Sequence, residues 1–195
     1  MTKNKKTPNK EILHSIEKII KCYYKMYNIK IENNQSISPE RIERMMTNEL
    51  FVGLDKKREP RIEYFFEKIK NNDEIKPVIV DNISIFSICE HHFLPFIGKA
   101  TFKYLPNKVI KHNNKMIAII GLSKIPRMID YLARKPQTQE RLTMEIFNKF
   151  KEILKTDNIS ISITCEHLCA KIRGVKDNIT MTTSKDGGIF NKKNI

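Results

Sequence analysis

Two short clusters of cysteine and histidine, far apart along the chain, are the feature that most constrains its fold. The first cluster is Cys89-Glu90-His91-His92 and the second is His167-Leu168-Cys169. Cys89, His92 and Cys169 offer a zinc ion three protein ligands and leave the fourth tetrahedral position to water. Three ligands with an open position are typical of catalytic zinc, whereas structural zinc is enclosed by four. The sequence therefore predicts a fold that brings both clusters to one metal site.

Each cluster also contains a histidine that the metal does not need, His91 in the first and His167 in the second. Histidine titrates near neutral pH and suits proton transfer beside an activated water, so both are candidate proton carriers of a hydrolase. Cys165 leaves an alternative open, because it could complete a closed site with four ligands. We interpret Cys165 instead as a small buried core residue, and Cys22 likewise.

The length and composition are those of an ordinary globular protein. The 195 residues suit one compact domain, with at most a small helical appendage. No apolar run reaches the roughly 18–20 residues that cross a bilayer, and the polar, lysine-rich residues 1–10 do not resemble a signal peptide. Four cysteines are too few for a secreted disulfide framework. We therefore expect a cytoplasmic protein.

The formal net charge of +14 raises the question of a nucleic-acid partner. Lysine, asparagine and isoleucine are all abundant, as a coding sequence rich in A and T would produce. The lysines are scattered along the chain and do not form one motif, so the charge by itself does not predict a nucleic-acid surface. A small polyanionic substrate fits the charge equally well.

The hydrophobic pattern changes from helical to extended near residue 77, which predicts an α+β protein with two regions. We expect an N-terminal helical region over residues 1–76 and a catalytic domain over residues 77–195. Helical spacing and capping signals predict helices at 9–28 and 38–50, a short helix within 55–76, and a helical stretch at 123–155 interrupted at Lys135-Pro136. A β-branched run predicts a strand at 78–88, and shorter apolar or alternating segments predict strands at 100–105, 116–120 and 159–163. This order of elements is typical of an antiparallel sheet.

If residues 159–173 form one extended strand, the side chains of the second cluster share one face. Side chains two residues apart then lie on the same face, which would aim Cys165, His167 and Cys169 at one site. Arg173 would fall on that face too and add a positive charge.

Four motifs, met in order along the chain, carry a resemblance to a known family. They are Cys89-Glu90-His91-His92-x-x-Pro-Phe-x-Gly-Lys99, Gly121-Leu122-Ser123-Lys124, the run from Pro136 to Thr143, and His167-x-Cys169-x-x-x-Arg173-Gly174. Together they resemble the zinc-dependent type of GTP cyclohydrolase I, over about residues 39 to 190. The resemblance implies an enzyme that converts GTP to 7,8-dihydroneopterin triphosphate and formate, using water that zinc activates for attack on C8 of the guanine.

The resemblance also implies roles for the residues at matching positions. Three would bind the zinc ion: Cys89, His92 and Cys169. Three more would act in catalysis, as proton carriers or in the later rearrangement: His91, His167 and Ser123. Glu140 would accept hydrogen bonds from the guanine N1–H and 2-amino group, with Gln139 as its neighbour. Five cationic residues would hold the triphosphate: Lys124, Arg127, Arg173, Arg41 and Arg44.

The fold that the resemblance implies is the tunnelling fold, an antiparallel four-stranded sheet with two long helices on one face, preceded by N-terminal helices. Subunits of the family join through their sheets into rings, and two pentamers stack into a decamer with active sites at subunit junctions. A homo-oligomer is therefore the expected partner arrangement, with GTP as substrate. Residues 107–120 exceed the short turn that the family has there, and they predict an additional surface hairpin.

Two alternatives remain. A related tunnelling-fold enzyme could act on another pterin or deazaguanine precursor, but such an enzyme should lack the full combination of motifs. A zinc-stabilised module that binds nucleic acid would need a closed four-ligand site using Cys165, clustered basic residues, and aromatic residues placed for stacking.

Overall fold

The computed structural model describes residues 9–30, 38–70, 74–111 and 114–191. The chain divides into two compact units, residues 1–52 and residues 53–195. The domain boundary expected after residue 76 stays a prediction, although residues 64–68 pair with a strand of the second unit. Within the described ranges, no helix is both long and apolar enough to cross a membrane.

The first unit contains helices whose starts are set by side-chain caps. Asn9 caps α1 (Lys10–Met26) through its side-chain oxygen. Ser38 does the same for α2 (Pro39–Met45), and a π-helical segment, Met46–Leu50, continues the chain. Asparagine and serine oxygens satisfy N–H groups that the first helical turn leaves without a backbone partner. Both predicted N-terminal helices are confirmed.

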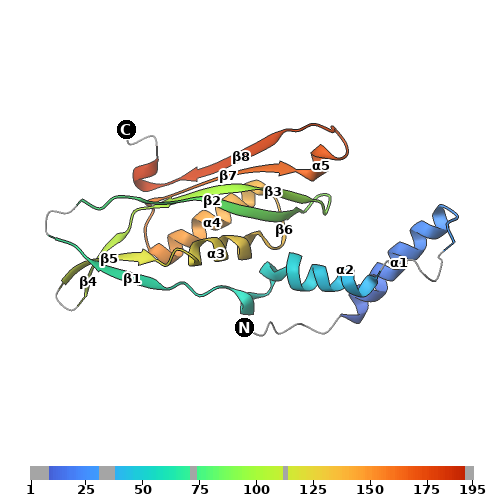
Figure 1. Ribbon diagram of the computed structural model, residues 1–195, viewed down its shortest axis with the longest axis horizontal. Coiled ribbons are helices and arrows are strands. Elements are labelled where there is room, and N and C mark those ends of the chain that lie inside the picture. The colour runs from blue at the N-terminus through green and yellow to red at the C-terminus, as the bar shows by residue number, and fades with distance from the viewer. Residues whose placement is uncertain (1–8, 31–37, 71–73, 112–113, 192–195) are drawn as a thin grey trace. The chain divides into compact units, whose positions relative to one another are not determined.

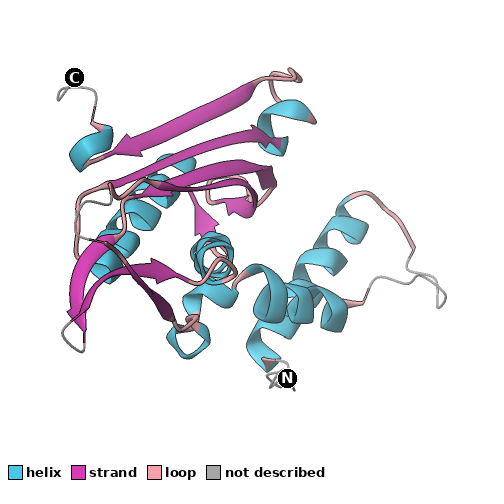
Figure 2. Cartoon of the chain, turned by 60° about the vertical axis from the view of Figure 1, so that its left-hand side comes forward, coloured by secondary structure: helices cyan, strands magenta, loops and turns pink. Residues whose placement is uncertain are grey.

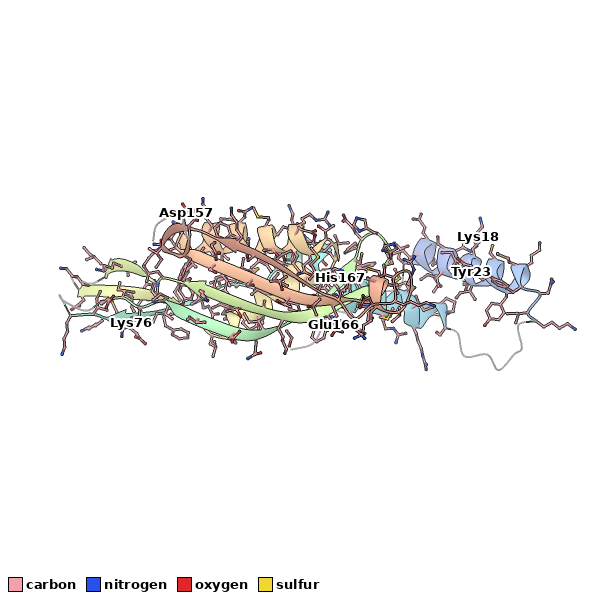
Figure 3. All side chains as sticks on the ribbon, turned by 90° about the horizontal axis from the view of Figure 1, so that it is seen from above. Lys18, Tyr23, Lys76, Asp157, Glu166 and His167 are labelled. Carbon is pink, nitrogen blue, oxygen red and sulfur yellow. The ribbon has the colours of Figure 1, made fainter. Side chains whose placement is uncertain are left out.

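Helix α1 buries none of its residues. Cys22 is exposed, so the interpretation of Cys22 as a core residue is wrong. Large apolar side chains such as Ile19 and Tyr23 lie at the surface of α1, where Figure 3 labels Tyr23. Apolar spacing therefore predicted the helix correctly, but spacing does not specify whether the same chain covers the apolar face.

A three-stranded antiparallel sheet lies near the start of the second unit. In it, β1 (Tyr64–Lys68) pairs with β5 (Asn114–Ile120), which pairs in turn with β4 (Asn107–Lys111). The short helix expected within residues 55–76 is therefore wrong, apart from a 3-10 turn at Lys56–Arg58. Aromatic residues favour a strand where a partner strand is present, and β5 supplies that partner.

The antiparallel pairing of β4 with β5 confirms the predicted hairpin. Its tip, residues 112–113, lies outside the described residues. The hairpin is joined to the helical layer at its base, where the Asn107 side-chain amide donates to the carbonyl of Leu154.

The larger sheet has five strands in the order β6-β2-β3-β7-β8, drawn in magenta in Figure 2. Their bounds are β2 (Val78–Cys89), β3 (Pro95–Tyr104), β6 (Pro136–Gln137), β7 (Ile159–His167) and β8 (Thr180–Asp186). Strands β2, β3, β7 and β8 pair antiparallel, which confirms the α+β class with an antiparallel sheet. The two-residue β6 adds a parallel pairing beside β2. The threonine- and serine-rich β8 has no apolar run, so the hydrophobic pattern did not reveal it.

Helices α3 (Lys124–Ala133) and α4 (Gln139–Leu154) cover one face of this sheet (Figure 1). The predicted interruption between them is confirmed, because the chain extends there as β6. The main core lies between the sheet and this helical layer. Phe102 of β3 and Phe150 of α4 are fully buried, with ring centroids 4.4 Å apart. Burying one such aromatic side chain contributes on the order of 2–3 kcal/mol.

Strand β7 ends at His167, and Leu168–Lys171 forms one helical turn, α5. The single strand considered for residues 159–173 is therefore wrong beyond His167. Cys165 and His167 still share a face of β7, whereas the helical turn and the chain after it place Cys169 and Arg173. Figure 3 shows His167 at the end of β7 away from Asp157, the end at which the metal-ligating residues gather.

Candidate metal centre and active site

Three side chains that could hold a metal ion converge at this end of the larger sheet. Cys89 is the last residue of β2, His92 lies in the turn that follows, and Cys169 lies in α5. One candidate ligand atom from each lies within 4.8 Å of the others. The Sγ atom of Cys89 is 3.9 Å from the Sγ of Cys169 and also 3.9 Å from the Nδ1 of His92. The fold therefore brings the two sequence clusters together.

The spacing and the donor set of this group fit zinc. Two sulphurs bound at about 2.3 Å to a tetrahedral zinc ion lie about 3.8 Å apart, close to the 3.9 Å between the sulphurs of Cys89 and Cys169. Two cysteines with one histidine are also a ligand set of catalytic zinc. Cys165 lies elsewhere, 1% exposed in the hydrophobic core, and burial raises the pKa of its thiol to about 12. Among the described residues, the group therefore offers three candidate ligands and excludes Cys165.

Backbone hydrogen bonds hold the turn that carries these ligands. The N–H of Cys89 donates to the carbonyl of Leu94 at 2.8 Å, and the N–H of Phe93 donates to the carbonyl of Cys89 at 2.9 Å. Phe93 has a left-handed backbone (φ 56°), which a bulky residue adopts only where its surroundings impose it. The N–H of Glu90 donates to the carbonyl of Gln137 in β6 at 3.0 Å. The turn is thus closed on itself and joined to β6.

Both spare histidines lie within two residues of a candidate metal ligand in the chain. His91 is exposed, and its Nδ1 is 3.8 Å from the Sγ of Cys89. His167 is half-buried, and its ring stacks on Phe96 with centroids 4.8 Å apart. Burial lowers the pKa of His167, while the negative charge of Glu140 opposes that shift. A neutral imidazole in a fixed plane is suited to accepting a proton.

Gln139 is 1% exposed and makes its side-chain contacts inside the protein. Its Nε2 donates to the carbonyls of Ile163 and Met181 at 3.0 Å and 2.9 Å. Its Oε1 therefore faces the other way, 2.8 Å from the Nε2 of His167. An amide oxygen only accepts, so His167 carries a hydrogen on Nε2 and its neutral form has the lone pair on Nδ1. The expected contact of Gln139 with guanine stays a prediction, while these contacts orient His167.

Glu140 and Arg173 add opposite charges at this end of the sheet. Glu140 lies in the first turn of α4, and the negative charge of its exposed carboxylate acts to raise the pKa of His167. Arg173 is exposed, and its positive charge acts to lower the pKa of Cys169. Burial and the hydrogen bond to the Cys89 thiol raise the pKa of Cys169, and the positive charge of Arg173 opposes that rise.

Ser123, Lys124 and Arg127 lie at or near the start of α3, and the metal group lies beyond its other end. The Ser87 hydroxyl donates to the carbonyl of Ala133 at 2.7 Å, so the end of α3 adjoins the last residues of β2. A helix of 10 residues is about 15 Å long. In Figure 1, α3 runs from the side of β5 towards β6. Within one copy of the chain, Ser123 and Lys124 therefore lie about one helix length from the end of α3 that adjoins β2, and Arg127 lies one turn nearer to that end.

Two further cations predicted for the triphosphate lie on α2, and one of those at the start of α3 has an ion-pair partner. Arg41 and Arg44 are exposed on α2 in the first unit, and the backbone N–H of Arg41 bonds to the capping hydroxyl of Ser38. Lys124 pairs with the carboxylate of Glu63 at 3.0 Å.

Three residues that contact the site received no role from the sequence: Glu90, Phe96 and Arg141. Phe96 supports the His167 ring. The guanidinium of Arg141 bonds to the Glu90 carboxylate, and this contact lowers the pKa of Glu90 and raises that of Arg141. All three lie inside the motifs quoted above, and this position was the sequence feature that could have indicated a role in the site. A motif does not say which of its side chains touch.

The fold and the site together define a class, an α+β protein with a candidate catalytic metal centre at one end of its sheet. A sequence model described as GTP cyclohydrolase I matches residues 12–195. The chain belongs to the GTP cyclohydrolase I family.

Relatives from several bacteria agree with this assignment. A GTP cyclohydrolase 1 from Wigglesworthia glossinidia brevipalpis is 41% identical over 189 residues, which cover 95% of this chain and 81% of the relative. One from Blochmanniella pennsylvanica is 39% identical over 178 residues, covering 90% and 75%. A third, from Klebsiella pneumoniae strain 342, is 42% identical over 154 residues, covering 78% and 64%.

Proposed function

We propose that this chain is a GTP cyclohydrolase I, which converts GTP to 7,8-dihydroneopterin triphosphate and formate. The observation that carries the proposal is the convergence of Cys89, His92 and Cys169, with two spare histidines in the same motifs, in a member of this family. Opening the guanine ring at C8 and releasing formate are hydrolytic steps that require activated water and proton transfer. The site has residues suited to both. Four antiparallel strands with two helices on one face support the tunnelling fold.

Zinc is the metal that this ligand group would hold. Cys89 and Cys169 would bind it through sulphur and His92 through an imidazole nitrogen, at separations that fit tetrahedral coordination. When bound, zinc supplies Lewis-acid activation of water at neutral pH. The core position of Cys165 supports a site with three protein ligands, as in catalytic rather than structural zinc sites.

Proton transfer would involve His167 and His91. His167 would accept a proton at Nδ1, because Gln139 occupies its Nε2–H and the Phe96 ring fixes its plane. Burial favours the neutral imidazole that this step needs. His91 is exposed and can exchange protons with solvent. Ser123 would assist the later rearrangement of the ribose.

Recognition of GTP would involve both ends of the nucleotide. Glu140 would accept hydrogen bonds from the guanine N1–H and 2-amino group, a donor pair that adenine lacks. Its exposed position in the first turn of α4 supports this role. Charge-assisted hydrogen bonds to the triphosphate would come from five cations: Lys124, Arg127, Arg173, Arg41 and Arg44. Lys124 would exchange its contact with Glu63 for a phosphate oxygen.

The distance between the start of α3 and the metal group supports an active site shared between subunits. A second copy of the chain would supply Ser123, Lys124 and Arg127 beside the metal group of the first copy. We expect the ring-forming decamer of the family, in which subunit junctions recur by symmetry.

Both alternatives receive less support. A zinc-stabilised nucleic-acid module would need Cys165 as a fourth ligand, but this thiol lies in the core. Another reaction on the same architecture is disfavoured by the family match over residues 12–195.

The test is incubation of the zinc-loaded protein with GTP, followed by assays for formate and for fluorescence of the oxidised pterin. We expect equal amounts of both products, and loss of both in His91→Ala. Formate without pterin would mean that ring opening proceeds and that the role proposed for Ser123 is at fault. No turnover by a folded, zinc-loaded oligomer would overturn the proposed activity.

A further inference from the structure

We propose that Arg141 is a positioning residue that holds the metal-ligand turn (residues 89–94) through Glu90 and thereby sets the zinc affinity of the chain. The inference rests on the proposed zinc site and goes beyond it, because neither Arg141 nor Glu90 is a candidate ligand or substrate contact. Arg141 lies in the first turn of α4, and its backbone N–H bonds to the capping hydroxyl of Thr138 at 3.2 Å.

The guanidinium of Arg141 bridges two segments of the chain. Its Nη2 donates to the carboxylate of Glu90 in the metal-ligand turn and to the carbonyl of Pro136 in β6, the latter at 3.1 Å. Its Nε donates to the Oε1 of Gln137 at 2.6 Å. A planar guanidinium with three acceptors fixes the direction of each contact, unlike a single flexible ion pair.

Gln137, which accepts a hydrogen bond from Arg141, is itself held by other side chains. Gln137 is fully buried, and its Nε2 donates to the carboxylate of Glu145 at 2.9 Å. Glu145 pairs in turn with Lys135 at 2.8 Å. A continuous chain of polar contacts therefore runs from Lys135 through Glu145, Gln137 and Arg141 to Glu90, and none of its members is a candidate metal ligand.

Glu90, the residue that Arg141 holds, lies inside the Cys89–His92 motif. Glu90 follows Cys89 directly and precedes His92 by two positions, so its placement constrains both ligands. His92 is exposed, so the turn provides the main restraint on its imidazole. Ligands already in place lose less conformational freedom when the metal binds, which strengthens binding. Substitution of a residue that orients a metal ligand typically weakens metal binding by about 10- to 100-fold.

An exposed ion pair is a weak basis for stability, and this bridge is partly exposed. The side chains of Arg141 and Glu90 are 43% and 33% exposed. Exposed pairs contribute little to folding, so Arg141 should matter for the geometry of the turn more than for the stability of the fold. This difference separates the positioning role from a merely structural one.

The experiment measures zinc affinity by competition with a chromophoric chelator, in the full-length protein. We expect about tenfold weaker binding in Arg141→Ala. Arg141→Lys should recover little, because an ammonium group does not reach three fixed acceptors in one plane. Arg134→Ala is the matched control and should bind zinc like the wild type. Arg134 is also partly exposed, but it pairs with Asp130 at 2.8 Å and lies over the Phe86 ring.

Two further measurements keep the result interpretable. Cobalt(II) absorption spectra report ligand geometry, and we expect a distorted spectrum in Arg141→Ala with an unchanged circular dichroism spectrum. If Arg141→Ala fails to fold, Glu90→Gln tests the same bridge from the other side and should also weaken zinc binding. Wild-type zinc affinity in both variants, or a raised KM for GTP with unchanged zinc affinity, would overturn the positioning role. Absence of zinc binding in the wild type would overturn the proposed zinc site and this inference with it.

Discussion

Two cysteines in neighbouring elements have different chemistry because their surroundings differ. Cys165 faces the core from β7, directly opposite Gly98 of β3. A Cβ atom on Gly98 would lie 2.6 Å from the Sγ of Cys165 and 1.9 Å from the carbonyl oxygen of Thr164. The glycine therefore leaves the space that the thiol occupies. Cys169 lies beyond the strand, where its Sγ meets that of Cys89.

We predict that Cys165→Ala keeps its zinc and loses roughly 1–2 kcal/mol of stability, because a small buried group is removed. Cys169→Ala should lose most of its zinc, because it lacks one of three ligands. Metal content after gel filtration and urea unfolding would measure the two effects. Loss of zinc in Cys165→Ala would contradict the three-ligand site.

At the scale of elements, the larger sheet contains an irregularity beside a titratable carboxylate, Asp81. The register between β2 and β3 shifts between Val80 and Ile83, and Asn82 there has a left-handed backbone. The Asp81 carboxylate accepts hydrogen bonds from the Thr101 hydroxyl at 2.5 Å and from the Asn82 N–H at 2.8 Å. The Thr101 bond first, and the backbone bond second, lower the pKa of Asp81 below its ordinary value of 3.8.

Because the pKa of Asp81 is lower in the folded chain, the folded chain binds fewer protons than the unfolded chain at pH values near this carboxyl's ordinary pKa. The free energy of unfolding therefore falls as the pH decreases through that region. We predict that Thr101→Val is less stable than the wild type at about pH 6 and that the difference shrinks towards about pH 3. Thr101→Ser keeps the hydroxyl and should follow the wild type. Urea unfolding at both pH values would measure this, and a constant difference would contradict the prediction.

Helix α4 begins at the end of the sheet that carries the candidate metal group, and its cap determines where its first residues lie. The Thr138 hydroxyl accepts the N–H of Arg141, and Gln139 and Glu140 follow Thr138 directly. We predict that Thr138→Ala loses about 1 kcal/mol of stability, as removal of a capping oxygen usually does. Thr138→Ser should restore most of it. Equal stability of all three proteins in denaturant unfolding would show that the cap is not needed.

At the scale of the whole molecule, the proposed active site is divided between the two ends of α3. Cys89 and His91 lie beyond one end, and Ser123 and Lys124 lie at the other. A homo-oligomer could unite both halves at each junction, because symmetry presents the same two surfaces repeatedly.

We predict that His91→Ala and Lys124→Ala are each nearly inactive and that mixed oligomers of the two regain about a quarter of wild-type activity, because random assembly joins two intact halves at that frequency. Equal mixtures would be dissociated, reassembled and assayed for formate release. The matched control is a mixture of His91→Ala with Cys169→Ala, two changes in the same half. Activity should stay absent there, and recovery in that control would contradict the divided site.

The sequence predicted those parts of the fold that depend on local pattern. Apolar spacing located α1 and α4, and β-branched or alternating apolar segments located β2, β5, β7 and the second half of β3. Prediction failed where a distant segment decided the structure. Residues 64–68 form a strand because β5 lies beside them. Cys22 is exposed on α1, because apolar spacing does not specify whether another segment covers the helix.

The sequence by itself determined the chemistry of this protein: the ligand types, the spare histidines and the family motifs are properties of residue identity and order. Only the tertiary structure decided which residues meet. It placed Cys165 in the core and Cys169 beside Cys89, joined Gln139 to His167, and separated Lys124 from the metal group. The physical reason is that side-chain chemistry is local, whereas contacts depend on where strands end, where helices begin and how the sheet orders them.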